Sequence, residues 1–83
     1  MTTDEIRATV LRLLCEIAPE ADPAAVQPDV EFRDQLDLDS MDLLNFVVAV
    51  DETLGVEIPE SEYGRLGTLD ALVGYVAEHG AAV

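Results

Sequence analysis

The stretch DSMDLLNFVVAVDETLG, from Asp39 to Gly55, decides the fold of this chain. Asp39 is a good N-cap residue, and with an acid three residues later it predicts a helix that begins at Ser40. The helix is expected to end near Leu54, because Gly55 readily takes the left-handed conformation that follows many helices. One face is apolar at the spacing of a buried side, and its residues are Leu43, Phe46, Val47, Val50 and Leu54.

A second face of the same helix is also apolar. Met41, Leu44 and Val48 lie on it, and the acidic Asp51 continues it. Surface helices usually carry polar groups at such positions, and exposed apolar patches often mark interaction sites. Docking of a partner is the favoured interpretation for Met41 and Val48. For Leu44, burial beneath the long loop or the short helix is an equal alternative.

The segment before this helix divides into another helix and a long connection. Thr2 and Glu5 form a capping-box pattern, which predicts a helix from Asp4 to Ile17. Its buried stripe is expected to be Ile6, Val10, Leu13, Leu14 and Ile17. From Pro19 to Asp39 no helical period is sustained, so a long loop is predicted. The expected anchors of this loop are Val30, Phe32 and Leu36.

The segment after Gly55 predicts two more helices. A single-turn helix is expected around Glu60 to Arg65, and Thr68 is the expected cap of a last helix that Gly80 ends. The inward residues of that helix are Leu69, Leu72, Val73 and Val76. The predicted fold class is all-α: a small four-helix bundle with three main helices, one short third helix and a long loop between the first and second.

Charge restricts the partners of this chain. Its 83 residues include 18 Asp and Glu against four Arg and no Lys, which gives a formal net charge of −14. Such a chain repels nucleic acid and anionic membrane surfaces, so it is expected either to have partners that present basic patches or to bind cations. Between Asp34 and Gly64 there are nine acidic residues and no basic one, and they surround Ser40 and the second apolar face. A solvated acidic face is the common alternative for such a run.

The compartment is indicated by what the chain lacks. Its single cysteine, Cys15, cannot form an internal disulfide, which is consistent with a reducing compartment. No apolar run approaches the length of a membrane span, and the N-terminus lacks the basic start of a signal peptide. A cytoplasmic protein without membrane insertion is expected. Cys15 points away from the buried stripe of the first helix and is interpreted as a partly exposed bystander.

Ser40 is the residue best placed for chemistry. It occupies the first turn of the predicted helix, where backbone N–H groups are unpaired and the helix dipole is positive. A phosphate ester on the serine oxygen would therefore lie in a favourable field. The position is also expected to be exposed, within reach of a modifying enzyme.

The motif DSMD (Asp39–Asp42), with Leu36 before it and LGVEIP (Leu54–Pro59) after the helix, closely resembles the acyl carrier protein family. The resemblance covers nearly the whole chain, and it implies that residues 1–83 form a single carrier domain. It also implies that Ser40 receives 4′-phosphopantetheine from coenzyme A through a phosphopantetheinyl transferase. The chain would then be a non-catalytic monomer that carries acyl groups as thioesters for fatty acid, polyketide or related lipid biosynthesis.

The resemblance also implies roles for other positions. The residues expected to contact acyl-loading and acyl-transferring enzymes, through basic docking patches on those enzymes, are Asp39, Met41, Asp42, Leu44, Val48, Asp51 and Glu52. An acyl tail would slip among Phe46, Val47, Val50, Ile58 and Leu72, although plain core packing is the simpler explanation of those residues. Asn45 stands where the family often has an acid, and Asp37 where it usually has glycine, so partner choice can differ.

The residues argue against two other interpretations, a serine hydrolase and a calcium-binding loop. A serine hydrolase would need a Gly-x-Ser-x-Gly elbow, and the only histidine, His79, lies at the chain end, where it fits a favourable charge at a helix C-terminus. A calcium-binding loop that began at Asp37 would need an oxygen ligand at its fifth position, glycine at its sixth and glutamate at its twelfth. This chain has Met41, Asp42 and Val48 at those three positions. No dedicated metal site is expected.

Two other interpretations stay open. A D-alanyl or other aminoacyl carrier protein resembles the same Asp-Ser stretch, and an unmodified acidic interaction module would use the same apolar face without needing Ser40. The start at Met1 and the end just past the last helix favour a dissociated system with separate partner enzymes over an excised domain.

Overall fold

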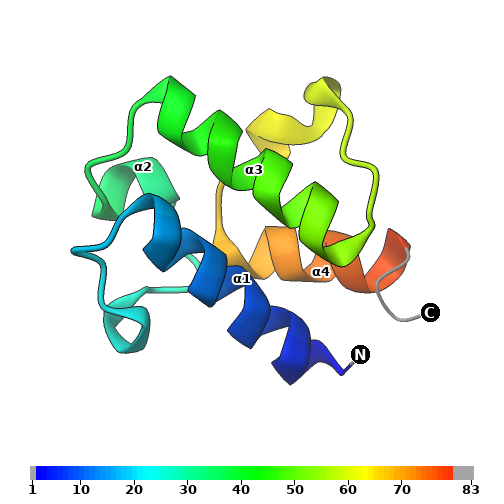
Figure 1. Cartoon of the computed structure of the whole chain (residues 1–83), viewed down its shortest axis with the longest axis horizontal. Coiled ribbons are helices and arrows are strands. Elements are labelled where there is room, and N and C mark those ends of the chain that lie inside the picture. The colour runs from blue at the N-terminus through cyan, green and yellow to red at the C-terminus, as the bar shows by residue number, and fades with distance from the viewer. Residues whose placement is uncertain (1, 80–83) are drawn as a thin grey trace.

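The computed structural model describes residues 2–79, and this part of the chain is all-helical (Figure 1). In chain order its elements are α1 (Thr3–Ile17), η1 (Pro23–Ala25), α2 (Phe32–Gln35), α3 (Ser40–Leu54), η2 (Glu60–Arg65) and α4 (Leu69–His79). The predicted fold class is confirmed, with three main helices and a short one before the last. The predicted end of the last helix at Gly80 lies outside the described residues.

The three long helices enclose one hydrophobic core, with α1 packed against both α3 and α4 (Figure 1). Each long helix buries the stripe that its sequence predicted, apart from residues at the edges. The buried members are Ile6, Val10, Leu13 and Leu14 of α1, Phe46, Val47 and Val50 of α3, and Leu69, Leu72, Val73 and Val76 of α4. The edge residues Ile17, Leu43 and Leu54 are partly buried and pack against this core.

The first helix begins with the capping box that its sequence predicted. The Thr2 hydroxyl oxygen accepts a hydrogen bond from the Glu5 backbone N–H at 3.1 Å, and Glu5 Oε1 accepts one from the Thr2 backbone N–H at 2.8 Å. The second of these bonds is the main reason that the pKa of the Glu5 carboxyl is lowered. The helix starts at Thr3, one residue before the predicted Asp4.

The long connection between α1 and α3 is more ordered than its sequence predicted. It contains η1 and α2, neither of which gives a helical period long enough to detect. Phe32 is fully buried, whereas the other two predicted anchors, Val30 and Leu36, are half-buried. Leu38 is an additional buried anchor that the sequence analysis missed.

Phe32 is the main fastening point of this connection. Its ring meets that of Phe46 edge to face, with centroids 5.2 Å apart and an interplanar angle of 84°. Its backbone N–H also donates to the Gly67 carbonyl oxygen at 2.8 Å. A second hydrogen bond, from the Asp70 N–H to the Pro28 carbonyl oxygen at 3.0 Å, joins the same connection to α4. The connection that leads to Ser40 is thus fixed to both α3 and α4.

Replacing Phe32 with alanine should destabilise the protein severely. Removing a fully buried phenylalanine side chain costs about 3–5 kcal/mol, which approaches the whole stability of a small domain. Urea unfolding followed by far-UV circular dichroism measures the change. The exposed neighbour Arg33 provides the control, since Arg33→Ala should alter the unfolding free energy by less than about 0.5 kcal/mol. An F32A variant as stable as R33A would show that the connection is not anchored there.

Candidate functional site

Ser40 is exposed on the first residue of α3, directly after the N-cap residue Asp39. The Asp39 carboxylate accepts a hydrogen bond from the Asp42 backbone N–H at 2.8 Å. The Asp42 carboxylate approaches the Asp39 backbone N–H at 3.5 Å, which completes a weaker reciprocal contact. On the other side, the buried side chain of Leu38 fixes the chain just before the cap. The start of the helix is therefore held from both directions while the serine side chain is left in solvent.

The position of Ser40 suits a covalently attached phosphate. Helix N-termini present unpaired backbone N–H groups and the positive end of the helix dipole, and both favour a phosphate ester. Attachment also requires that a second protein reach the hydroxyl group, and exposure of Ser40 allows this. The local structure thus fits a phosphodiester linkage at the serine oxygen.

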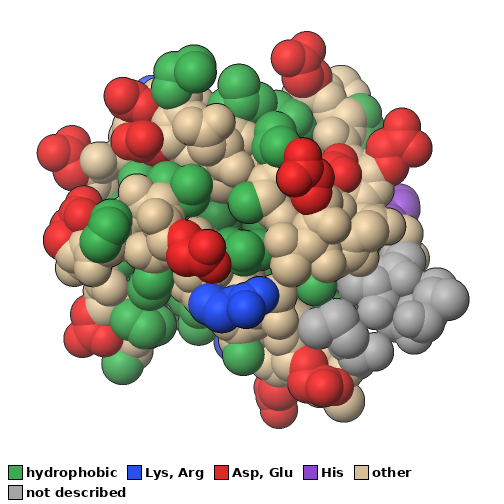
Figure 2. All heavy atoms as spheres, viewed as in Figure 1, with side chains coloured by type: hydrophobic (Ala, Val, Ile, Leu, Met, Phe, Trp, Pro, Cys, Tyr) green, Lys and Arg blue, Asp and Glu red, His purple; other side chains and the backbone are tan. Residues whose placement is uncertain are grey.

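The second apolar face of α3 reaches the surface. Met41 is 62% exposed and Val48 is 38% exposed, the two largest exposures among the bulky hydrophobic residues described. Leu44 between them is half-buried. Figure 2 shows apolar side chains at the surface along α3, with Asp and Glu side chains on either side of them. An apolar strip bordered by carboxylates is therefore present on the helix that begins at Ser40.

The acidic residues of this face have different local roles. Glu52 is exposed, whereas Asp42 and Asp51 are half-buried. Asp42 takes part in the helix cap, and Asp51 Oδ2 accepts a hydrogen bond from the Ile58 backbone N–H at 3.1 Å. Spacing along the chain placed Asp51 at the end of the second apolar face, but it did not reveal the hydrogen bond between Asp51 and Ile58, which depends on the turn after Gly55.

The residues named for an acyl tail all belong to the hydrophobic core. Phe46, Val47, Val50, Ile58 and Leu72 are at most 5% exposed. Three of them come from α3, one from the segment before η2 and one from α4. Their packing matches the simpler of the two explanations, an ordinary core.

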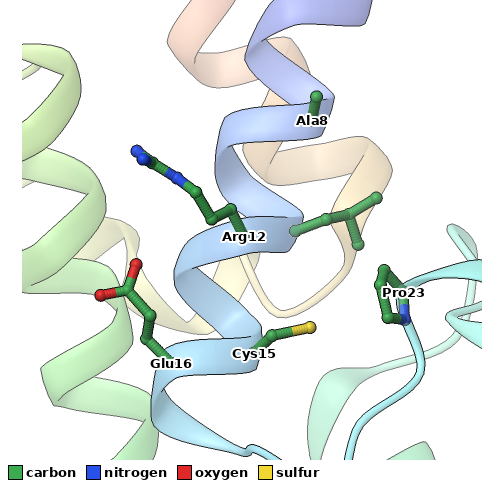
Figure 3. A pocket seen from close by; sticks show the side chains of 6 residues that line it. Ala8, Arg12, Cys15, Glu16 and Pro23 are labelled. Carbon is green, nitrogen blue, oxygen red and sulfur yellow. The ribbon is translucent and has the colours of Figure 1, made fainter.

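Cys15 and His79 belong to helices other than α3, Cys15 to α1 and His79 to α4. Cys15 is half-buried beside an open groove of about 590 Å³ on the outer side of α1, and its Sγ lies 3.6 Å from the Ala21 carbonyl oxygen. In Figure 3 the Cys15 side chain points toward the side of α1 on which Pro23 lies, whereas the Arg12 and Glu16 side chains point to the opposite side. The His79 ring stacks on Tyr75, with centroids 4.1 Å apart.

Two further observations concern ions and membranes. Among residues 2–79, no three His, Cys, Asp or Glu side chains converge in a way that could hold a metal ion. The helices in this same part of the chain are all too short or too polar to cross a membrane.

The fold and the position of Ser40 define a small helical carrier module. The family model described as "Phosphopantetheine attachment site" matches residues 8–76, which is most of the chain. The chain therefore belongs to the acyl carrier protein family, whose members carry a phosphopantetheine group and are not enzymes.

Individual relatives support this membership. The chain is 34% identical to an acyl carrier protein of Rubrobacter xylanophilus, over 92% of this chain and 98% of that one. It is 37% identical to an acyl carrier protein of Acidothermus cellulolyticus, over 93% and 90% of the two chains. The solved structure of the acyl carrier protein from Enterococcus faecalis has the same fold, with a TM-score of 0.76 and 22% identity over 96% of this chain and all of that one.

Asp39→Ala should weaken the start of α3 without unfolding the protein. Loss of an Asp N-cap typically costs about 1 kcal/mol, because the first backbone N–H groups lose their acceptor. Urea titration gives this difference in unfolding free energy. Asp37→Ala removes an equal charge from an exposed position outside the cap, and it should change stability by less than about 0.5 kcal/mol. Equal effects of the two variants would contradict a specific capping role.

Proposed function

We propose that Ser40 is the attachment point of 4′-phosphopantetheine and that the chain carries acyl groups on this arm. The observation that supports the proposal most directly is the exposed serine at the N-terminus of α3, inside the region matched by the attachment-site family. When attached, the arm supplies a terminal thiol that holds an acyl group as a thioester. The protein supplies a fixed anchor, so the arm can present its cargo to one enzyme after another at high effective concentration.

We further propose that Met41, Leu44 and Val48 form the docking face for partner enzymes, with Asp39, Asp42, Asp51 and Glu52 as its acidic contacts. The partners are a phosphopantetheinyl transferase and enzymes that load or transfer the acyl group. Two features support this: the exposure of Met41 and Val48, and the absence of any Lys or Arg between residues 34 and 64. Carboxylates around an apolar strip attract a basic partner surface and orient it over the strip.

The cargo is proposed to be a fatty acyl, polyketide or related lipid intermediate, and the site of action the cytoplasm. A D-alanyl or other aminoacyl cargo is the alternative. The relatives from Rubrobacter xylanophilus and Acidothermus cellulolyticus are acyl carrier proteins by name, which favours the first of these classes. The residues proposed to admit an acyl tail remain Phe46, Val47, Val50, Ile58 and Leu72, which would have to move apart because they are now closely packed.

Attachment at Ser40 can be tested by intact-mass measurement. Incubation with coenzyme A and a phosphopantetheinyl transferase should raise the mass of the wild-type chain by one phosphopantetheine group. Ser40→Ala should abolish this gain, because no hydroxyl group remains at the helix start. Ser61→Ala removes the only other serine, which is also exposed, and it should leave the gain intact. A wild-type chain that gains no mass, or an S40A variant that gains it, would overturn the proposal.

The docking face can be tested through the rate of the same modification. Met41→Gln keeps the size of the side chain but makes the exposed strip polar, so kcat/KM of the transferase should fall about three- to tenfold, the loss expected for roughly 1 kcal/mol of apolar contact. The change should appear mainly in KM. Leu11→Gln makes a partly buried apolar position of α1 polar, away from α3, and should alter kcat/KM by less than about twofold while the chain remains folded. Equal losses in the two variants would place docking elsewhere.

A further inference from the structure

Arg33 lies beside the turn of α3 that carries Ser40. Arg33 and Leu43 line the same small pocket, of about 130 Å³, between α2, α3 and η2. Leu43 follows Ser40 by three residues, so the two are neighbours on the surface of α3. Helical side chains lean toward the N-terminus, so the Leu43 side chain covers the turn that begins at Ser40. The pocket that Arg33 lines is therefore next to the serine.

Arg33 takes part in neither of the two ion pairs among the described residues, which involve Arg7 and Arg65. The nearest acid at the pocket is Glu31, which also lines it. The Glu31 carboxylate lies against Gly67, in the space that a Cβ atom would take there, and it forms no ion pair with Arg33 in the described part of the chain. The Arg33 guanidinium therefore keeps N–H donors for another acceptor.

A phosphodiester at Ser40 would have strong need of a basic partner. Asp37, Asp39 and Asp42 all lie within three residues of the serine, and their carboxylates repel a phosphate that the helix N-terminus attracts. The nearest Arg or Lys along the sequence is Arg33. A guanidinium group forms charge-assisted and often bidentate hydrogen bonds with phosphate oxygens. Arg33 thus supplies the charge that the surroundings of Ser40 otherwise lack.

We propose that Arg33 pairs with the phosphate of the arm and holds the first part of the arm over this pocket. The inference rests on the proposed function, because it requires the arm to be attached at Ser40. The pocket also suits the pantoyl group that follows the phosphate, since Leu43 supplies an apolar surface for its methyl groups and Tyr63 a side chain with a hydroxyl group. Its volume of about 130 Å³ is below the roughly 300–1,000 Å³ of pockets that enclose whole small molecules, so it suits only part of the arm.

The pairing separates the arm from the proposed docking face. At about 100° per residue, Leu43 lies about 60° to one side of Ser40, whereas Leu44 and Val48 lie to the other side. An arm held on the Leu43 side leaves the apolar strip uncovered. Arg33 therefore positions the arm so that a carrier already loaded with its arm can still present the docking face to an enzyme.

Chemical shifts before and after attachment test the pairing. The ¹⁵N-labelled full chain is treated with coenzyme A and a phosphopantetheinyl transferase, and its mass gain is measured first. Attachment should shift the Arg33 Nε–H signal and the Gly64 and Gly67 amide signals. These changes should shrink at about 1 M salt, where the screening length is about 3 Å and an exposed ion pair is weakened. Unchanged signals at all three residues in a chain that has gained its arm would overturn the pairing.

Arg33→Gln removes the charge and keeps a polar side chain. The shifts that attachment causes at Gly64 and Gly67 should fall about threefold, as expected when an exposed ion pair is lost, and the ³¹P signal of the arm should narrow because the phosphate is less restricted. Arg12→Gln is the matched control, since Arg12 is also exposed and outside both ion pairs but lies on α1, and it should keep the wild-type shifts. Full shifts in R33Q, or equal losses in both variants, would overturn the role of Arg33.

Glu31→Gln tests the pairing with the opposite sign. It removes the carboxylate that shares the pocket and repels the phosphate, so a higher salt concentration should be needed to halve the shifts at Gly64 and Gly67. Shifts that fall in E31Q as they do in R33Q would show that any change at the pocket disturbs them, and would overturn the pairing. If Ser40 gains its arm and these signals do not respond, the proposed function stands and only the pairing falls, whereas a chain that gains no arm overturns both.

Discussion

The cap at Asp39 is the contact on which the candidate site depends. It fixes the residue at which α3 begins, and with it the place of Ser40 at a helix N-terminus. A shift of the helix start by one residue would rotate every side chain of α3 by about 100° relative to the core. The cap, the buried Leu38 before it and the left-handed Gly55 (φ 65°) at the far end together hold α3 in one register. In that register the buried stripe meets the core while Met41 and Val48 face solvent.

The elements that could be predicted are those whose signals lie within one or two helical turns. The caps at Thr2, Asp39 and Thr68 and the stop at Gly55 act through neighbours in sequence, and the structure has each of them. The 3.6-residue period of α3 also predicted which of its apolar side chains are buried and which are exposed, as the buried Phe46 and the exposed Val48 show. Local chemistry was sufficient for the start of α3 and hence for the candidate attachment residue.

The parts that could not be predicted depend on contacts distant in sequence. The connection before α3 is organised by the edge-to-face pair of Phe32 and Phe46 and by a hydrogen bond to Gly67, and neither leaves a periodic signal. The hydrogen bond from the Ile58 backbone N–H to Asp51 depends in the same way on the turn after Gly55, which brings Ile58 back to α3. Charge patterning placed Asp51 among surface acids, and only the folded chain reveals its second contact.

The acidic surface also explains why stability must come from the core. Within residues 2–79 the ion pairs are Arg7–Asp70 at 3.2 Å and Arg65–Glu62 at 2.9 Å, and each has at least one well-exposed partner. Such pairs contribute little, whereas repulsion among the many carboxylates opposes the compact state. The stabilising free energy therefore comes from the apolar core residues that α1, α3 and α4 contribute, and from the connection that Phe32 anchors to this core. Neither of these ion pairs involves a carboxylate of α3, so the acids of this helix do not hold the long helices together. Asp42 instead belongs to the cap of α3, Asp51 accepts a hydrogen bond from the segment that follows the helix, and Glu52 is exposed.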